Sequence, residues 1–206
     1  MAVHPPTFCS VSQLEDEGFL SDESGPGEFR DLDLLEDVLR RAGNDLIVCE
    51  PQRVQYGDYE TLQRYTMSNT AVIEWRGSRG SGDLTGTRFE SAADAERWIV
   101  TDASGYIRDD RGLPIAHWLP DQEHELPEGF TLEQDGAGVL LTWSASGTEH
   151  RVRFGGALPE ARAVQFSAVA RVPLDQIEEC ALQLDARSAF AAAASATSRW
   201  TTPSCR

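Results

Sequence analysis

The 206-residue chain contains no lysine, so all eighteen of its basic residues are arginine. This absence excludes enzyme classes whose chemistry depends on a lysine: P-loop nucleotide-binding proteins, pyridoxal enzymes with a Schiff-base lysine, protein kinases and penicillin-binding enzymes. Asparagine is also scarce, at two residues. We interpret both scarcities as the coding bias of a GC-rich bacterial genome, not as a functional signal.

Basic residues are outnumbered by thirty-four acids, which leaves a net charge of -16 and a pI near 4.5. Nucleic acid is therefore excluded as a partner, because binding it requires basic residues that neutralise phosphates. The chain also lacks an apolar run of transmembrane length and a basic region followed by an apolar stretch at its N-terminus. These absences predict a cytoplasmic protein with no membrane partner.

Cysteine is rare and widely spaced, and no CxxC pair occurs. Free thiols are therefore expected at all four positions, Cys9, Cys49, Cys180 and Cys205.

Acidity is concentrated at the N-terminus, where residues 1–37 carry ten acids and one arginine. Residues 1–30 combine these acids with proline, glycine and serine, which predicts a disordered acidic arm. Residues 188–206 are rich in alanine, serine and threonine and predict a flexible, low-complexity tail. Residues 31–187 are then expected to form a single domain, long enough to bury a core without disulfides or metals.

Periodicity predicts helices over residues 31–42, from Ser91 to just before Gly105, and after Pro173. Three strands are expected within residues 45–75, followed by a glycine- and serine-rich loop over residues 76–86. Residues 109–129 are expected to form a long loop, and residues 163–172 one further strand.

The clearest strand signal lies in residues 130–154, where alternating apolar residues are separated by turns at Asp135-Gly136 and Ser146-Gly147. This predicts a three-stranded meander. Strands and helices do not alternate strictly along the chain, so the fold class predicted is α+β: an antiparallel sheet with meander hairpins packed by about three helices.

No catalytic, cofactor-binding or metal-binding constellation is predicted. His117 and His124 are seven residues apart in a proline-broken segment and match no metal-ligand spacing, and His150 is expected to be a paired strand residue. The glycine-rich run at residues 77–82 lacks the lysine and the adjoining helix of a phosphate loop. No Gly-x-Ser-x-Gly motif supports a hydrolase serine.

Acidic side chains cluster around Trp118 in the predicted loop, and acids beside an aromatic anchor suit a basic protein surface. An equally simple interpretation is a loop that is merely soluble. The partner-binding residues predicted here are Asp109, Asp110, Trp118, Asp121, Glu123 and Glu125.

The order of several short motifs resembles the TNT antitoxin family, the immunity proteins of bacterial polymorphic toxin systems. The motifs are Arg41-Ala42-Gly43, Arg64-Tyr65, the helix from Phe89-Glu90 to Glu96-Arg97-Trp98, Gly105-Tyr106-Ile107-Arg108, Glu128-Gly129-Phe130-Thr131-Leu132 and the helix after Pro173. The resemblance covers about residues 31–186.

This resemblance implies a cytoplasmic inhibitor that binds the catalytic domain of a secreted, NAD-hydrolysing toxin and occludes its active site, with no reaction or cofactor of its own. Two alternatives remain open on the residues alone. One is an acidic interaction or regulatory module unrelated to toxins, and the other is an enzyme whose site is dispersed in sequence.

Overall fold

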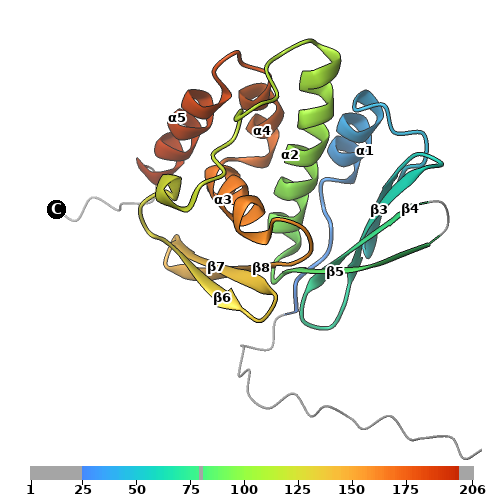
Figure 1. The fold of residues 1–206 in the computed structure, drawn as a ribbon, viewed down its shortest axis with the longest axis horizontal. Coiled ribbons are helices and arrows are strands. Elements are labelled where there is room, and N and C mark those ends of the chain that lie inside the picture. Colours follow the sequence, from blue (N-terminus) through green and yellow to red (C-terminus); the bar gives the residue numbers. More distant parts are fainter. Residues whose placement is uncertain (1–24, 79–80, 200–206) are drawn as a thin grey trace, which may run out of the picture.

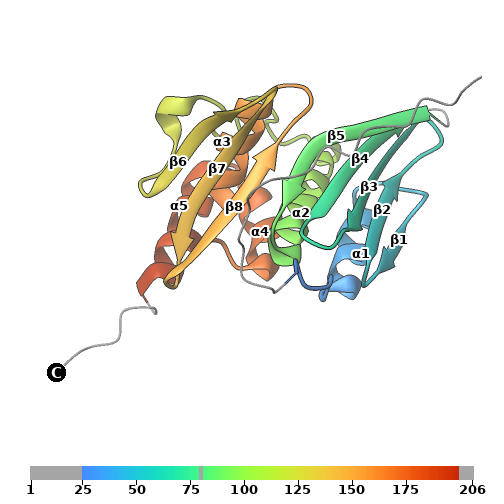
Figure 2. The same cartoon turned by 90° about the horizontal axis from the view of Figure 1, so that it is seen from below.

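The computed structural model describes residues 25–78 and 81–199. They form one eight-stranded antiparallel sheet with strand order β1-β2-β3-β4-β5-β8-β7-β6, and helices cover one of its faces (Figures 1 and 2). The predicted α+β class, with meander hairpins and packing helices, is therefore confirmed. The strands are β1 (Val48–Glu50), β2 (Arg53–Gly57), β3 (Thr61–Met67), β4 (Val72–Ser78), β5 (Ser81–Phe89), β6 (Phe130–Asp135), β7 (Gly138–Ala145) and β8 (Thr148–Phe154).

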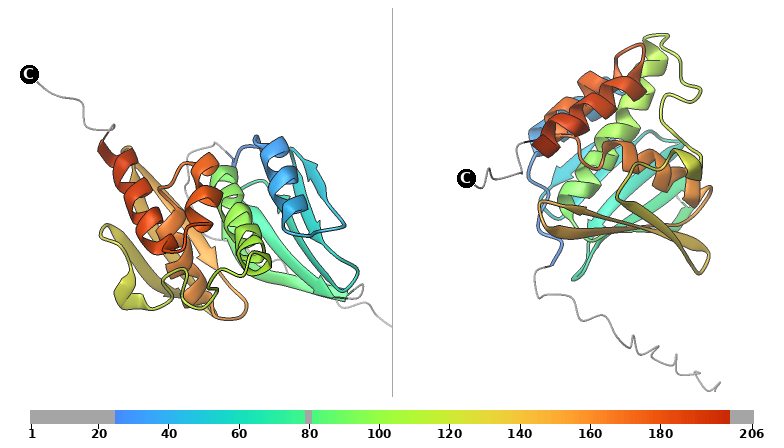
Figure 3. Two further views of the ribbon diagram at one scale, coloured as in Figure 1. Left: turned by 90° about the horizontal axis from the view of Figure 1, so that it is seen from above. Right: turned by 90° about the vertical axis from the view of Figure 1, so that its left-hand side faces the viewer.

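Four helices lie side by side above the sheet in the order α1, α2, α4, α5, and α3 packs beneath them on β7 and β8 (Figure 3). The helices are α1 (Leu32–Arg41), α2 (Ala92–Asp110), the short 3-10 helix η1 (Glu123–Glu125), α3 (Pro159–Val169), α4 (Leu174–Ala181) and α5 (Ala186–Arg199). None of the helices in the described ranges is both long and apolar enough to cross a membrane.

The sheet consists of two meanders, β1–β5 and β6–β8, joined by a short antiparallel pairing of β5 with β8. The second meander confirms the prediction for residues 130–154. Its turn at Ser146-Gly147 has positive φ at both residues, 53° and 81°, as the two-residue hairpin requires.

The first meander has more strands than predicted. Residues 45–75 contain β1, β2, β3 and the start of β4, so the expectation of three strands was wrong, and so was the expectation of a loop over residues 76–86. Glycines there belong to the β4–β5 hairpin, where Gly77 pairs with Gly82. A Cβ at Gly82 would lie 2.4 Å from the Trp75 ring, so these glycines leave room for an indole lying across the hairpin.

Helix α2 extends further than predicted, passing Gly105 and ending at Asp110. Gly105 lies against the Trp118 ring, since a Cβ at this position would be 3.5 Å from it. Ser91 occupies the N-cap position as predicted but makes no side-chain capping bond. The long loop predicted from residue 109 therefore begins only after α2.

Residues 163–172 do not form the predicted strand, since most of them belong to α3. Their apolar residues recur at helical spacing, with Ala163, Phe166 and Val169 all buried, and Pro159 occupies the first turn, where proline suits a helix. The helix predicted after Pro173 is confirmed as α4.

Both predicted chain ends are more ordered than expected. Residues 186–199 form α5, in which Phe190 is 1% exposed, so the folded part continues past the predicted boundary at residue 187. At the other end, Phe29 is 2% exposed and its N–H donates to the Pro51 carbonyl at 3.0 Å. Residues 1–24 of the predicted arm, 200–206 of the tail, Cys9 and Cys205 lie outside the described residues, whereas Cys49 and Cys180 are free thiols.

The core between helices and sheet is an aromatic cluster in which Phe166 of α3 contacts four other rings at centroid distances of 5.7 to 6.2 Å. These rings belong to Phe89, Trp98, Trp143 and Phe154. Such edge-to-face contacts add to the stabilisation from burial. They fix α2 and α3 on the sheet, and both helices contribute residues to the candidate site.

Candidate functional site

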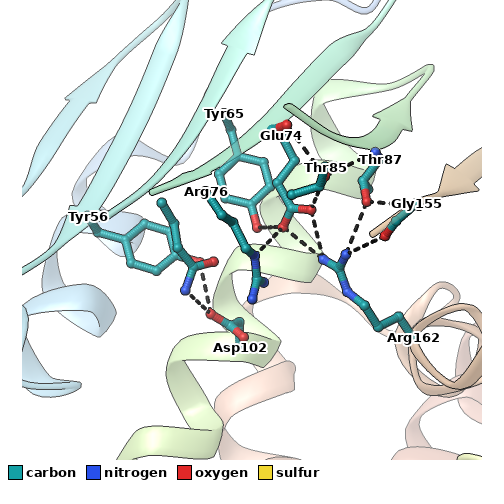
Figure 4. Close-up of polar contacts among 10 residues, drawn as sticks. Tyr56, Tyr65, Glu74, Arg76, Thr85, Thr87, Asp102, Gly155 and Arg162 are labelled. Carbon is teal, nitrogen blue, oxygen red and sulfur yellow. Dashed lines mark hydrogen bonds and ion pairs between the residues drawn. The ribbon is translucent and has the colours of Figure 1, made fainter. Parts of the chain in front are cut away.

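A buried ion pair lies where α3 meets β4, with Glu74 at 0% exposure (Figure 4). Arg162 donates through Nη2 to both Glu74 carboxylate oxygens, at 2.8 and 2.9 Å. Tyr65 Oη donates at 2.8 Å, Thr85 Oγ1 at 2.7 Å and Arg76 Nε at 3.1 Å. All of these hydrogen-bond donors favour the ionised form of the Glu74 carboxylate, because each directs positive charge or the positive end of an N–H or O–H dipole toward it.

Burial alone would raise the pKa of the Glu74 carboxyl, but the guanidinium groups of Arg162 and Arg76 and the hydrogen bond from Thr85 outweigh it. The pKa is lowered from 4.5 to about 2. A carboxylate of such low basicity is a weak general base and carries no proton to give at neutral pH. The Glu74 cluster therefore has the character of a structural ion pair.

Asp102 of α2 continues the polar layer toward the surface (Figure 4). Its Oδ2 accepts hydrogen bonds from Tyr56 Oη at 3.0 Å and Gln63 Nε2 at 3.1 Å. Burial, followed by the negative charge of Asp102, raises the pKa of Tyr56, so this phenol remains a neutral donor. Asp102 is thus held from the sheet side through one oxygen, and it makes no ion pair with the described residues.

One face of α2 lines a cavity of about 390 Å³ beside Asp102, which we call the α2 pocket. The helical residues share a face because they are three or four positions apart, and the opposite wall comes from residues 115–119 and from α3. The α2 pocket is lined by Trp98, Thr101, Asp102, Gly105, Tyr106, Asp109, Ile115, Trp118, Leu119 and Gln165. Its volume lies within the range of sites that hold a small ligand or an inserted side chain.

The α2 pocket combines acids with aromatic groups. Tyr106 is 55% exposed, and the neighbouring Asp102 carboxylate, followed by burial, raises the pKa of its phenol. Trp98 is 4% exposed, yet its indole Nε1 has no hydrogen-bond acceptor among the described residues. The pocket therefore offers the carboxylates of Asp102 and Asp109 beside aromatic walls.

Two of the predicted partner-binding residues, Asp109 and Trp118, line the α2 pocket. Trp118 is half-buried: its ring lies 6.3 Å from that of Phe190, and the guanidinium of Arg108 lies 5.3 Å from the indole centroid. Asp110 ends α2 and is exposed. Contacts with α2 and α5 thus hold the Trp118 ring in place as a wall of the pocket. Its exposed part remains available to a partner.

The other predicted residues lie further along the loop, and their carboxylates differ in availability. Glu125 Oε2 accepts from the backbone N–H groups of Asp121 and Gln122 at 3.0 and 3.1 Å, and Arg187 Nη1 donates to Oε1 at 2.5 Å. These three contacts lower the pKa of Glu125 to about 2. Glu125 therefore fixes the loop, whereas Glu123 is exposed.

A second cavity, of about 440 Å³, lies on the other side of this loop between η1, α3 and α5. Three of its charged side chains are engaged within the fold: Glu125 pairs with Arg187, and the Arg171 guanidinium lies 4.4 Å from the Phe130 ring centroid. The α2 pocket is therefore the better candidate for binding.

The three histidines in the described part of the chain do not gather with a set of metal ligands. His150 Nδ1 lies 3.3 Å from Asp94 Oδ2, and its ring stacks on Trp143 at 5.0 Å, as expected for a paired strand residue. Within the described ranges, no group of three or more His, Cys, Asp and Glu side chains could hold a metal ion.

Sequence reasoning missed Asp102 and Tyr106, because residues 98–109 were interpreted as a core helix and its following loop. A signal was present: Trp98, Asp102, Tyr106 and Asp109 recur at helical spacing and mix aromatic with acidic groups. That pattern indicates a helix face which is neither core nor plain solvent surface.

The chain matches one protein-family model and is similar to a solved structure. A family model described as immunity protein 61 (Imm61) matches residues 57–187, a range that contains every residue of the α2 pocket. Among solved structures the chain is similar to Rv3902c from M. tuberculosis, with a TM-score of 0.62, 18% sequence identity, and coverage of 81% of this chain and 95% of that chain. This likeness shows a shared fold. No curated protein matches the chain.

Proposed function

The chain belongs to the immunity protein 61 family, and from this premise we propose that it neutralises a cognate toxin by binding the toxin's catalytic domain and occluding its active site. Family membership is the observation that carries the proposal. An inhibitor of this kind acts stoichiometrically and needs no reaction of its own. The low basicity of Glu74 and its complete pairing within the fold agree with such a role.

The finer proposal is that the toxin hydrolyses NAD and that inhibition takes place in the cytoplasm. It rests on the order of sequence motifs that resembles the TNT antitoxins, from Arg41-Ala42-Gly43 to the helix after Pro173. Most of these motifs fall within residues matched by the family model.

We place the contact surface on the C-terminal part of α2 and the loop that follows it. Asp109 and Trp118 would contact the toxin at the α2 pocket, and Asp110 and Glu123 would form an exposed acidic rim. Rim charges mainly raise the association rate with a basic partner and make it sensitive to salt. Asp121 and Glu125 would act by holding the loop in shape, because Glu125 is tied to Arg187.

The test is a titration of a candidate toxin catalytic domain, sought among the genes next to the gene of this chain. NAD consumption by that domain is expected to fall in proportion to added protein and to reach zero near an equimolar ratio. An unrelated acidic protein of similar net charge is the matched control and should leave the activity unchanged. Full toxin activity in excess folded protein would overturn the immunity proposal.

The same titration separates the immunity function from the proposal that the toxin hydrolyses NAD. A toxin that is bound and neutralised, but that consumes no NAD in the absence of this protein, would leave the immunity function standing and refute the NAD-hydrolysing class of partner.

A further inference from the structure

We propose that the α2 pocket receives an arginine side chain from the toxin, with the guanidinium bound at Asp102 and the side chain lying along Tyr106. This inference rests on the proposed function, because it assigns a site and a chemistry to the same partner. It starts from two observations: a cavity whose lining combines aromatic rings with the carboxylates of Asp102 and Asp109, and the lack of an ion pair for either carboxylate among the described residues.

The two carboxylates of the pocket are widely spaced. Asp102 and Asp109 are two helical turns apart on α2, which separates their backbones by roughly 10 Å along the helix axis. One metal ion cannot bridge carboxylates so placed, and the described residues supply no third ligand. An extended cationic side chain suits the arrangement, since Asp109 lies at the exposed end and Asp102 at the half-buried end.

Asp102 keeps part of its hydrogen-bonding capacity free. Its Oδ2 is occupied by Tyr56 and Gln63, while its Oδ1 accepts no hydrogen bond from the described part of the chain. Arg76 interacts with Asp102 electrostatically but forms its side-chain hydrogen bond with Glu74, at 3.1 Å. A residue that lines the pocket thus keeps one carboxylate oxygen for a partner, and the sheet fixes its position.

The aromatic walls of the pocket favour arginine over lysine. The walls of the pocket include the Tyr106 and Trp118 rings, and a planar guanidinium stacks on aromatic faces while donating in its plane to a carboxylate. A lysine ammonium, a compact and strongly hydrated point charge, uses such walls less well.

The first arm of the test uses a small probe, N-acetyl-arginine amide, with N-acetyl-citrulline amide as the neutral control of nearly the same shape. Binding is followed by the indole N–H resonances of the ¹⁵N-labelled full chain, and Trp98→Phe assigns the resonance of Trp98. The arginine probe is expected to shift the Trp98 signal in a saturable way. Equal shifts from the citrulline probe, or no shift from either, would overturn the proposal.

The second arm uses the toxin catalytic domain. Asp102→Asn and Asp109→Asn remove charge with little change of shape, and together they are expected to weaken toxin binding by at least about tenfold, the usual scale for a charge-assisted contact. Asp33→Asn is the matched control: it removes the same charge from an exposed position on α1, outside both the pocket and the proposed acidic rim. Unchanged affinity in folded pocket variants would overturn the proposal.

The failures can be told apart. If the wild-type chain inhibits the toxin and the pocket variants inhibit it equally well, the pocket inference is wrong and the immunity function stands. If the wild-type chain does not inhibit the toxin at all, the proposed function is wrong, and the probe arm alone decides the chemistry of the pocket. Should Asp102→Asn fail to fold, the exposed Asp109→Asn variant carries the test.

Discussion

Replacing Arg162 with methionine should destabilise the fold by about 3 kcal/mol at pH 7, because it leaves the Glu74 carboxylate buried with its main counter-ion removed. Removing one partner of a buried pair generally costs about 3–5 kcal/mol. Tyr65, Thr85 and Arg76 still contact Glu74 in the variant, which places the expected loss near the lower end.

The pH dependence reports on the same carboxylate, because its pKa shift is the net result of burial and of all its contacts, among which Arg162 lowers the pKa most. The lowering of the Glu74 pKa from 4.5 to about 2 corresponds to roughly 3 kcal/mol of stability, at about 1.4 kcal/mol per pH unit. Because the folded-state pKa is depressed, this stabilisation is fully present above pH 4.5 and is lost as the pH falls toward 2. The difference between wild type and Arg162→Met should therefore shrink over that interval.

Urea unfolding, followed by tryptophan fluorescence and circular dichroism between pH 3 and pH 7, measures both quantities. Arg40→Met is the matched control, since Arg40 forms an exposed pair with Glu36 on α1, and exposed pairs contribute about 0–1 kcal/mol. A loss below about 1 kcal/mol for Arg162→Met at pH 7, or a loss that does not depend on pH, would refute the assignment of Glu74 as an ionised, buried partner.

Two further predictions concern segments outside the central sheet. Phe29→Ala should lower the free energy of unfolding by about 3–5 kcal/mol, as expected for truncating a buried phenylalanine, and a loss under about 1 kcal/mol in urea unfolding would show that residues 25–30 are not docked. Glu125→Gln should loosen the loop at neutral pH and change the fluorescence of Trp118, with Glu123→Gln as the exposed control. In the wild type the same change should appear only as the pH falls from 4.5 toward 2, because the Glu125 pKa is depressed, and an acid-insensitive loop would contradict it.

The sequence correctly predicted those elements whose formation depends on residues close together in the chain. Helix α1 and the β6–β8 meander were predicted because a helical stripe and paired turn signals are encoded in neighbouring residues. The β4–β5 hairpin was not predicted because its glycines leave room for the Trp75 ring. This contact between ring and glycine forms only when the strands pair. Residues 163–172 were misassigned because Ala163, Phe166 and Val169 suit a buried helix as well as a strand, and periodicity alone separates these two poorly.

The candidate site was predicted only in part for a related reason. Clustering along the chain drew attention to Asp109 and Trp118, and both line the α2 pocket. It also drew attention to Glu125, whose partner Arg187 lies on α5, in a stretch expected to be largely tail. Asp102 went unnoticed because its partners Tyr56 and Gln63 lie on strands far away in sequence, and only the folded sheet brings them together.

Asp102 also connects the stability of the fold with the proposed recognition. Tyr56 and Gln63 hold one of its oxygens, so the carboxylate is oriented before any partner arrives. A site whose side chains are already fixed loses less conformational entropy on binding than one built on a free loop. Recognition centred on α2 would therefore combine a rigid inner acid with an exposed outer rim, the first governing how long a complex lasts and the second how fast it forms.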